Sequence, residues 1–486
     1  MTGGAPSIVR RVSFSPPASS VRGLRHSRIW VYAGIAVVGT AASVQIVDSG
    51  AGIPKPLVLL LALAGGALMF SIRTERLLLG WLFLAPILQE SAGTHRIGSL
   101  LGLALYTAPP AIFALKTILN RGIRPAARWF DAAPALYVGY VFGSLAIASD
   151  ALGTNFVGTS RAFFQTVALG ALIYYVIVFW PGRAVAAAHV CGVVLAAAGL
   201  QAAMSIVEFG TGWNLWNDLG WRTAGDIQRS VGTLANPALL GAFIGVGLVV
   251  ALGVVCWDGP RQLRRLAWLV LVVGPPGLLF TFTRGPILAT VLVACSVLLL
   301  SARTRLIGVG VVAVVGIAIF AAWPSITSSG LYQKRVVQQQ NVQIRVVLQE
   351  VSIKLAEEKP LFGWGYGSFD RVKYDVKINN PGVPLAVVLH DTSHDTFLTI
   401  LVEYGSLGLI LFLLPFVVIC WPALRLVRTG VPERWLYVVA TAAIGVVVLS
   451  ATTFDLRFFS LIPMLPWLFL GLARRAQADA VGSPAS

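Results

Sequence analysis

The sequence predicts an all-α polytopic membrane protein, and three observations carry this prediction. Hydrophobic residues fill 57% of the 486 positions and charged residues only 12%, whereas a soluble globular protein has roughly 25% charged residues. The mean hydropathy is +0.79. Apolar runs close to the ~20 residues that cross a bilayer recur along the chain, and short loops between them hold most of the charge. We therefore expect about 12 to 14 transmembrane helices and one large external loop.

Each expected helix is an apolar run bounded by charged residues or by turns rich in Gly and Pro. The second and third runs are short and fit either a tight hairpin or interfacial helices, so the expected number of spans is a range. The runs lie approximately at residues 29–47, 57–72, 76–90, 99–115, 132–149, 163–180, 184–208, 237–257, 266–282, 286–302, 306–323, 396–420, 435–453 and 458–473.

Basic residues divide the loops into two alternating sets, one rich and one poor in Lys and Arg. The rich set faces the cytoplasm in membrane proteins, so both termini are expected there and the long polar segment outside. Because the net charge of +17 is dispersed among loops, it indicates topology and not nucleic-acid binding. The expected organisation is a disordered cytoplasmic N-terminus (1–28), transmembrane helices 1–11 (29–323), a large external loop with an amphipathic helix (324–395), transmembrane helices 12–14 (396–473) and a cytoplasmic tail (474–486).

Two of the expected helices start on the outer face with an arginine nearby. Asn236 and Pro237 suit the N-cap and the first position of one helix, and Arg229 lies just upstream. Arg284 stands in a short turn directly before Pro286, the expected start of the other helix.

A third outer start lies in the stretch 389–397, which closes the long polar segment. Thr392 and Asp395 fit the S/T-x-x-D/E capping pattern with Thr392 as N-cap, which puts His394 in the first turn. Each helix N-terminus carries roughly half a positive charge. If the fold brings the three starts together, they form with His394 and the two arginines an anion site suited to phosphate.

Each of these side chains also has a purely structural interpretation. Arg229 can be a solvated loop residue, and His390 and His394 can simply cap the helix. Arg284 can reach the headgroups from the membrane edge. A charge between two apolar spans costs several kcal/mol unless it reaches water, headgroups or a partner, so Arg284 is the hardest of the four to explain structurally.

The long external loop contains an amphipathic pattern at residues 341–358, which predicts a helix. In its simplest interpretation this helix lies along the membrane surface. Pro360 ends it, and Gly alternates with aromatic residues in the turn that follows; these rings either bind a sugar face or pack the turn. The apolar side consists of Ile344, Val347, Leu348, Val351 and Leu355.

Taken in order, these elements resemble the O-antigen ligase and polymerase superfamily over about residues 205 to 420. No single motif is specific, and the order of five motifs carries the resemblance. They are Arg229-x-x-Gly232-Thr233-x-x-Asn236-Pro237; Thr283-Arg284-Gly285; Arg345; Glu358-Lys359-Pro360-Leu361-Phe362-Gly363-Trp364-Gly365; and Ser393-His394-Asp395-Thr396-Phe397-Leu398 with Glu403-Tyr404-Gly405-Ser406-Leu407-Gly408-Leu409.

The resemblance implies a multi-span glycosyltransferase of the lipid-dependent C type. Such proteins take a glycan from an isoprenoid pyrophosphate carrier on the outer leaflet and join it to an acceptor hydroxyl, without a nucleotide sugar, metal or other cofactor. The family's functional residues match His394, Arg284 and Arg229, and a further common arginine matches Arg345. The family usually has Asn where this chain has Asp395, and fewer spans before the loop.

We expect His394 to act as the base or as the group that orients the acceptor, because an imidazole with a pKa of about 6.5 suits proton removal. Arg284 and Arg229 would hold the pyrophosphate as permanently charged, forked donors. Asp391 or Asp395 would orient the imidazole. Direct attack on the anomeric carbon would invert its configuration. The candidate substrate-binding residues are Arg345, Asp391, Asp395 and His390.

The preferred reaction is polymerisation of polysaccharide repeat units, and the alternative is ligation of finished glycan to a lipid, protein or wall acceptor. A carrier or flippase for lipid-linked glycan would need charges along a path within the helices, and few are found. A peptidoglycan polymerase of the shape-and-division type, with Asp391 as its acid, fits the motifs poorly. We expect the protein in the cytoplasmic (inner) membrane. The expected partners are the lipid-linked donor, a glycan or other hydroxyl acceptor, the bilayer, and flippase and chain-length proteins.

Overall fold

Every regular element that the structure describes is a helix, which confirms the all-α fold class. Four described helices are long and apolar enough to cross a membrane, so the chain is a polytopic membrane protein. The expected total of about 12 to 14 spans stays a prediction, because several expected spans fall outside the described residues. The computed structural model describes residues 72–93, 98–119, 127–151, 162–180, 187–214, 229–234, 236–300, 304–306, 309–310, 340–376, 393–428, 433–456 and 461–482.

Most described helices correspond to an apolar run of the sequence, although their ends differ. The helix α10 begins five residues before the expected run at 266 and takes in three arginines, and α19 continues into the expected tail. The helices are α3 (Thr74–Gly93), α4 (Gly98–Leu119), η3 (Trp129–Ala132), α5 (Ala133–Ala151), the π-helix η4 (Phe164–Ala168), α7 (Leu169–Val178), α8 (Ala187–Thr211), α9 (Pro237–Cys256), α10 (Arg261–Leu279), α11 (Arg284–Leu300), α14 (Gln340–Glu358), α15 (Phe369–Val372), η7 (Lys373–Asp375), α17 (Thr396–Arg428), α18 (Arg434–Ala451) and α19 (Leu461–Gly482).

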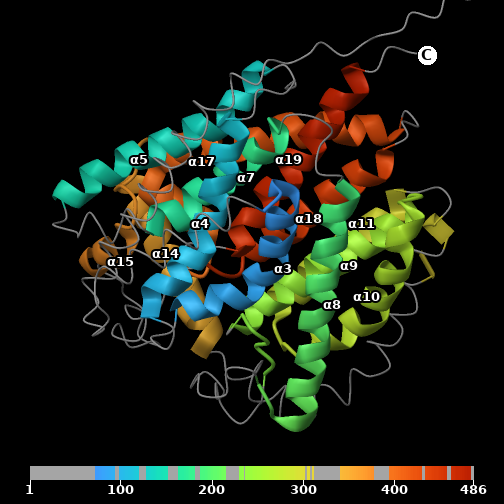
Figure 1. The fold of residues 1–486 in the computed structure, drawn as a ribbon. Coiled ribbons are helices and arrows are strands. Elements are labelled where there is room, and N and C mark those ends of the chain that lie inside the picture. Colours follow the sequence, from blue (N-terminus) through green and yellow to red (C-terminus); the bar gives the residue numbers. More distant parts are fainter. Residues whose placement is uncertain are drawn as a thin grey trace, which may run out of the picture. The chain divides into compact units, whose positions relative to one another are not determined.

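The helix α9 is surrounded by α8, α10, α11 and α18, and it is buried over most of its length (Figure 1). Glycines allow this close packing. Gly247 lies against Ala198 of α8, and Gly253 lies against Val439 of α18, without room for a Cβ at either glycine. Membrane helices associate through such small residues because the lipid gives them no hydrophobic driving force. The packing therefore fixes α9 against α8 and α18.

The helix α17 is broken at Gly405, where the backbone has φ 65° and ψ −173°. Residues of the loop before α17 fill the break. The N–H of Trp364 donates to the carbonyl of Val402 (2.9 Å), and the N–H of Ser406 donates to the carbonyl of Pro360 (2.8 Å). Backbone groups freed by the break are therefore satisfied by the loop, as a helix in a membrane protein requires.

The rings of the Gly-aromatic turn pack the turn itself. Tyr366 is 5% exposed and stacks on Tyr404 of α17, with 6.2 Å between ring centroids. The indole N–H of Trp364 donates to the carbonyl of Leu355 at 3.0 Å, and Lys359 lies over its ring. Of the two interpretations of this turn, packing is therefore the one that holds for Trp364 and Tyr366.

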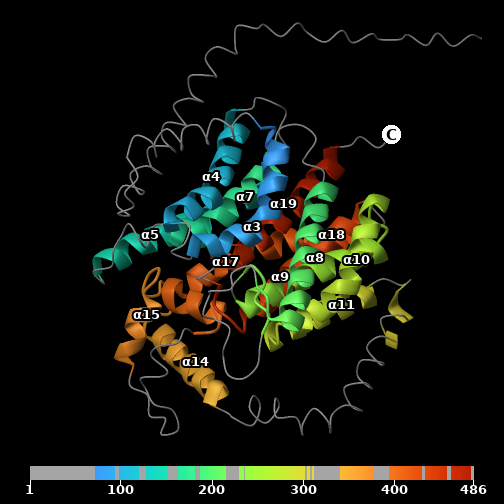
Figure 2. The same ribbon diagram turned by 60° about the horizontal axis from the view of Figure 1, so that its bottom comes forward.

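The predicted amphipathic helix is present as α14, and its apolar face is buried inside the protein. Val351 and Leu355 pack with Phe369, Val372 and Val402 in one cluster. The helix contacts α17, beside which it and α15 lie in Figure 2. This face is covered by α17 and the loop and is therefore not free to rest on a membrane surface, whereas the position of the helix along that surface stays a prediction.

A buried ion pair joins η3 to α19. The guanidinium of Arg474 donates to both carboxylate oxygens of Asp131, at 2.8 Å each, and the hydroxyl of Tyr174 donates to the same carboxylate at 2.8 Å. Arg474 is 1% exposed and Asp131 is 4% exposed. The neighbouring Arg475 donates to the carbonyls of residues 178 and 180. Both arginines fall in the segment expected from the sequence to be the tail (474–486), and the structure places them inside α19.

Candidate functional site

The start of α9 confirms its prediction. Asn236 is the N-cap, and its side-chain oxygen accepts from the N–H groups of Ala238 (2.8 Å) and Leu239 (3.4 Å). Pro237 is the first helical residue, where its missing N–H costs nothing. Arg229 lies seven positions before this cap and is half-buried.

The start of α11 lies two residues earlier than expected. Arg284 is itself the first helical residue, and its side chain is exposed. Phe282 precedes it with a φ of 47°, a left-handed conformation that turns the chain sharply into the helix. Arg284 is therefore fixed to a helix N-terminus and is not part of a loose turn.

The start of α17 differs from its prediction. Asp395 is the N-terminal cap, and its Oδ1 accepts from the N–H groups of Phe397 (2.8 Å) and Leu398 (3.1 Å). Thr392 lies outside the described residues, and the capping box that begins there is wrong because the helix starts at Thr396. His394 precedes the helix with a φ of 52° instead of lying in its first turn. The His394 imidazole therefore belongs to a sharp turn directly before the start of α17.

The starts of α9 and α11 lie side by side. The N–H of Ser230 donates to the carbonyl of Phe280 at 3.1 Å, and the hydroxyl of Thr283 donates to the carbonyl of Pro237 at 3.4 Å. A Cβ at Gly241 of α9 would lie 2.7 Å from the Thr283 hydroxyl, so the two elements are in direct contact. The segments that carry Arg229 and Arg284 are therefore neighbours.

The turn at residues 452–456, between α18 and α19, links the third start to the other two. Thr453 lies against Gly285 so closely that a Cβ there has no room. On its other side, the Thr396 hydroxyl donates to the carbonyl of Phe454 and accepts from the N–H of Leu456, each at 3.0 Å. The three helix starts are thus brought together around this turn.

Asp455 is the residue of this site that the sequence reasoning missed. Its carboxylate is 3% exposed and accepts from the hydroxyls of Thr399 (3.1 Å) and Ser393 (3.5 Å), on either side of His394 and Asp395. A signal was present, because an acidic residue between two apolar spans needs a partner. The partners lie about 60 positions away in the sequence, so the pairing was not visible there.

No direct contact with the three helix starts is described for the remaining predicted residues, Arg345, His390 and Asp391. Arg345 lies on the exposed side of α14, a helix that contacts α17. His390 and Asp391 lie outside the described residues, so their predicted roles stay predictions.

Within the described part of the chain, no hydrogen-bond partner reaches the buried Nε of Arg229. A buried donor of this kind argues against a solvated loop residue and suits an anionic ligand.

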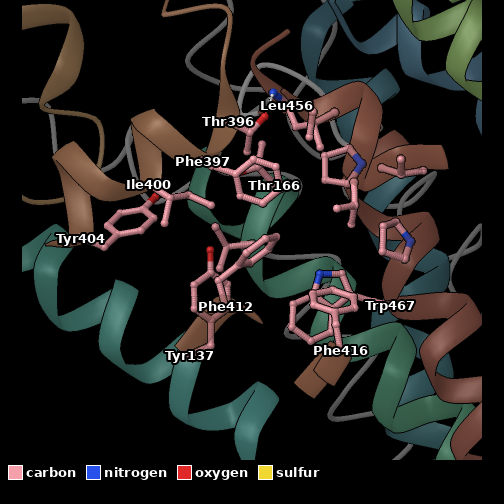
Figure 3. A pocket seen from close by; sticks show the side chains of 16 residues that line it. Tyr137, Thr166, Thr396, Phe397, Ile400, Tyr404, Phe412, Phe416, Leu456 and Trp467 are labelled. Atoms are coloured by element: carbon pink, nitrogen blue, oxygen red, sulfur yellow. Dashed lines mark hydrogen bonds between the residues drawn. The ribbon is translucent and has the colours of Figure 1, made fainter. Parts of the chain in front are cut away.

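A small apolar cavity of about 50 Å³ lies beneath the start of α17. Figure 3 shows Thr396 and Phe397 on one side of it, with Tyr137, Phe416 and Trp467 on the other. An engineered apolar cavity that binds one benzene molecule has a volume of roughly 150 Å³. This cavity is therefore too small to hold a sugar.

Burial raises the pKa of the Asp395 carboxyl, and the nearby Asp455 adds to this, while the two N–H groups of α17 oppose it. We expect Asp395→Asn to preserve the cap, because the amide oxygen accepts the same bonds, and Asp395→Ala to lose about 1 kcal/mol of stability. Because the pKa of Asp395 in the folded protein lies above its ordinary value of 3.8, deprotonation of this carboxyl destabilises the folded state. Wild type should therefore lose stability relative to Asp395→Asn as the pH rises from 3.8 through the raised pKa of Asp395.

Thermal unfolding of the three detergent-solubilised proteins between pH 3.5 and 8 checks this prediction. A stability difference between wild type and Asp395→Asn that does not change with pH contradicts the raised pKa. Equal stability of Asp395→Ala and Asp395→Asn contradicts the cap.

Comparison with protein families gives a match to part of the chain. Residues 269–413 match the model of the family described as O-antigen ligase. This range includes Arg284, Arg345 and His394, whereas Arg229 and Asp455 fall outside it. No curated protein matches the chain. The resemblance to the O-antigen ligase and polymerase superfamily seen in the sequence is confirmed over the matched range, residues 269–413.

Proposed function

We propose that the protein transfers a glycan from an isoprenoid pyrophosphate carrier to an acceptor hydroxyl on the outer face of the cytoplasmic membrane. The matched domain supports a glycan transferase of the O-antigen ligase and polymerase type. The observation that carries the proposal is the convergence of three helix N-termini, which bear Arg229, Arg284 and His394, around one turn.

The leaving group is a pyrophosphate, and the site offers positive charge for it. The N-termini of α9, α11 and α17 each contribute roughly half a positive charge, while Asn236 and Asp395 already bond the first N–H groups of α9 and α17. Arg284 is exposed at one of them, and Arg229 has a buried Nε without a partner among the described residues. We propose that these groups stabilise the departing pyrophosphate without a metal ion, because they supply its counter-charge directly.

His394 is the proposed base for the acceptor hydroxyl, or the group that orients it. Its left-handed turn is held on both sides, by Asp395 as the cap and by Ser393 and Thr399 on Asp455. A base fixed in this way can meet the hydroxyl in a reactive geometry. Direct attack of that hydroxyl on the anomeric carbon inverts its configuration.

We prefer polymerisation of repeat units, with ligation to a lipid, protein or wall acceptor as the alternative outcome of the test below. The termini are proposed to face the cytoplasm, because the Arg-rich loops do so in membrane proteins. Flippase and chain-length proteins are the proposed partners. A carrier function has less support, since the Glu403 carboxylate in α17 accepts from the N–H of Phe369 and so serves the loop packing.

Cells that lack the protein, complemented with variants, test the proposal. Arg284→Ala should lower glycan transfer by about 10²–10³-fold, because one donor to the developing charge is lost. Glycan transfer by Arg284→Lys should lie between that of Arg284→Ala and that of wild type, because lysine keeps the positive charge but lacks the forked guanidinium. Arg265→Ala is the control, because this exposed arginine belongs to the other end of α10.

Surface glycan, carrier-linked glycan and membrane level of each variant are measured together. Wild-type transfer by Arg284→Ala would rule out the pyrophosphate clamp. In cells without the protein, single units on the carrier indicate a polymerase, whereas full-length glycan stranded on the carrier indicates a ligase.

A further inference from the structure

The helix α8 carries a polar stripe that is buried in the protein. Gln201, Ser205 and Glu208 are 1%, 0% and 3% exposed, and their spacing of four and three places them on one helix face. The helix is otherwise apolar enough to cross a membrane. Buried polar side chains in such a helix cost free energy unless they are paired, and they commonly serve function.

The Glu208 carboxylate binds the backbone that follows Arg229. Its Oε2 accepts from the N–H groups of Val231 and Gly232, both at 2.9 Å, and its Oε1 accepts from the side-chain amide of Asn214 at 2.6 Å. All three bonds use the carboxylate as an acceptor, which is what the ionised form offers. Hydrogen bonds to an ionised acceptor are about twice as strong as neutral ones.

The rest of the stripe holds the same segment. The amide of Gln201 donates to the Thr233 hydroxyl (2.6 Å) and accepts from the Thr233 N–H (3.2 Å). The Ser230 hydroxyl donates to the carbonyl of Ser205 at 2.8 Å. Gly232 has a φ of 57°, and a Cβ there would lie 2.7 Å from the Gln201 side-chain oxygen. Residues 230–233 are therefore held in one conformation by α8.

We propose that Glu208 is a positioning residue for Arg229. The proposal rests on the proposed function, in which Arg229 binds the pyrophosphate. The carboxylate bonds to the backbone of Val231 and Gly232 and to Asn214, so it acts on Arg229 through the backbone that follows it. Glu208 fixes the backbone at Val231, two residues after Arg229. An arginine whose backbone is fixed loses less conformational entropy when it binds an anion.

The variant Glu208→Gln tests this, because it keeps the shape but replaces one acceptor by an NH₂ group. Hydrogen–deuterium exchange of the full-length protein in detergent should rise by about 10- to 100-fold at the amides of Val231 and Gly232, since the neutral amide oxygen is a weaker acceptor for both N–H groups and the new NH₂ group faces the Asn214 donor. Exchange within α17 should not change. The control Glu357→Gln, on the exposed side of α14, should leave both regions as in wild type.

Transfer in complemented cells gives the functional readout. Glu208→Gln should lower transfer in wild type but add little in an Arg229→Ala background, because both changes act through the same guanidinium. Gly232→Ala displaces the same segment without altering Glu208 and should lower transfer likewise.

The outcomes separate the two proposals. Unchanged exchange at Val231 and Gly232, or fully additive losses in the double variant, overturns the positioning role of Glu208. If Arg229→Ala transfers glycan at the wild-type rate, the pyrophosphate role of Arg229 fails and the positioning proposal with it, even where exchange has risen.

Discussion

Replacement of His394 by alanine is expected to lower glycan transfer by about 10²–10⁴-fold, which is the usual contribution of a positioned base. The imidazole precedes α17 in a left-handed turn between Ser393 and Asp395, whose bonds fix the turn independently of the ring. The fold should therefore survive the loss of the ring while the reaction does not. Transfer and membrane level in complemented cells are the measurements.

The backbone at His394 requires a control of its own. With a φ of 52°, alanine at this position is strained by about 1–3 kcal/mol, whereas asparagine adopts this conformation readily. His394→Asn should therefore fold as well as wild type and still lose transfer. If His394→Asn transfers glycan at the wild-type rate, the imidazole is not the base.

Local sequence patterns predicted the ends of helices well where the cap is made by neighbours. The N-cap at Asn236, with Pro237 behind it, could be predicted because all its partners lie within three residues. The same rule failed at α17, where Thr392 and Asp395 both fit a cap and only the turn at His394 decides between them. A capping pattern alone does not reveal a left-handed residue inside it.

Long-range pairing explains what the sequence did not reveal. The break in α17 at Gly405 falls inside an apolar run and exists because the loop around Trp364 satisfies the freed backbone. Asp455 became part of the site only when the fold carried it to Ser393 and Thr399. Each case depends on partners from another element, which neither periodicity nor local spacing contains.

The turn at residues 452–456 gives the site a common support. It touches the start of α11 through Thr453 and the start of α17 through Phe454 and Asp455. A shift of this turn would move the groups on both helices relative to each other. Misplacement by about 1 Å can cost 10²-fold in rate, so this turn is expected to tolerate little change.

Replacement of Arg474 by alanine is expected to destabilise the protein by about 3–5 kcal/mol, because it leaves the Asp131 carboxylate buried without its counter-charge. The pair is almost fully buried and doubly hydrogen-bonded, so solvent does not screen it. The double variant Asp131→Asn with Arg474→Met should be more stable than Arg474→Ala alone, since the stranded charge is gone and the volume of Arg474 is largely kept.

Thermal unfolding in detergent and the membrane level in cells measure this effect, with the exposed Arg265→Ala as control. An unfolding temperature of Arg474→Ala equal to that of wild type would show that the pair does not hold η3 to α19. If the double variant is no more stable than Arg474→Ala, the loss comes from contacts that only the guanidinium makes, such as its contact with the Phe130 ring, and not from the stranded charge. In either outcome glycan transfer per folded molecule should stay near wild type, because the pair lies on elements other than the three helix starts that form the site.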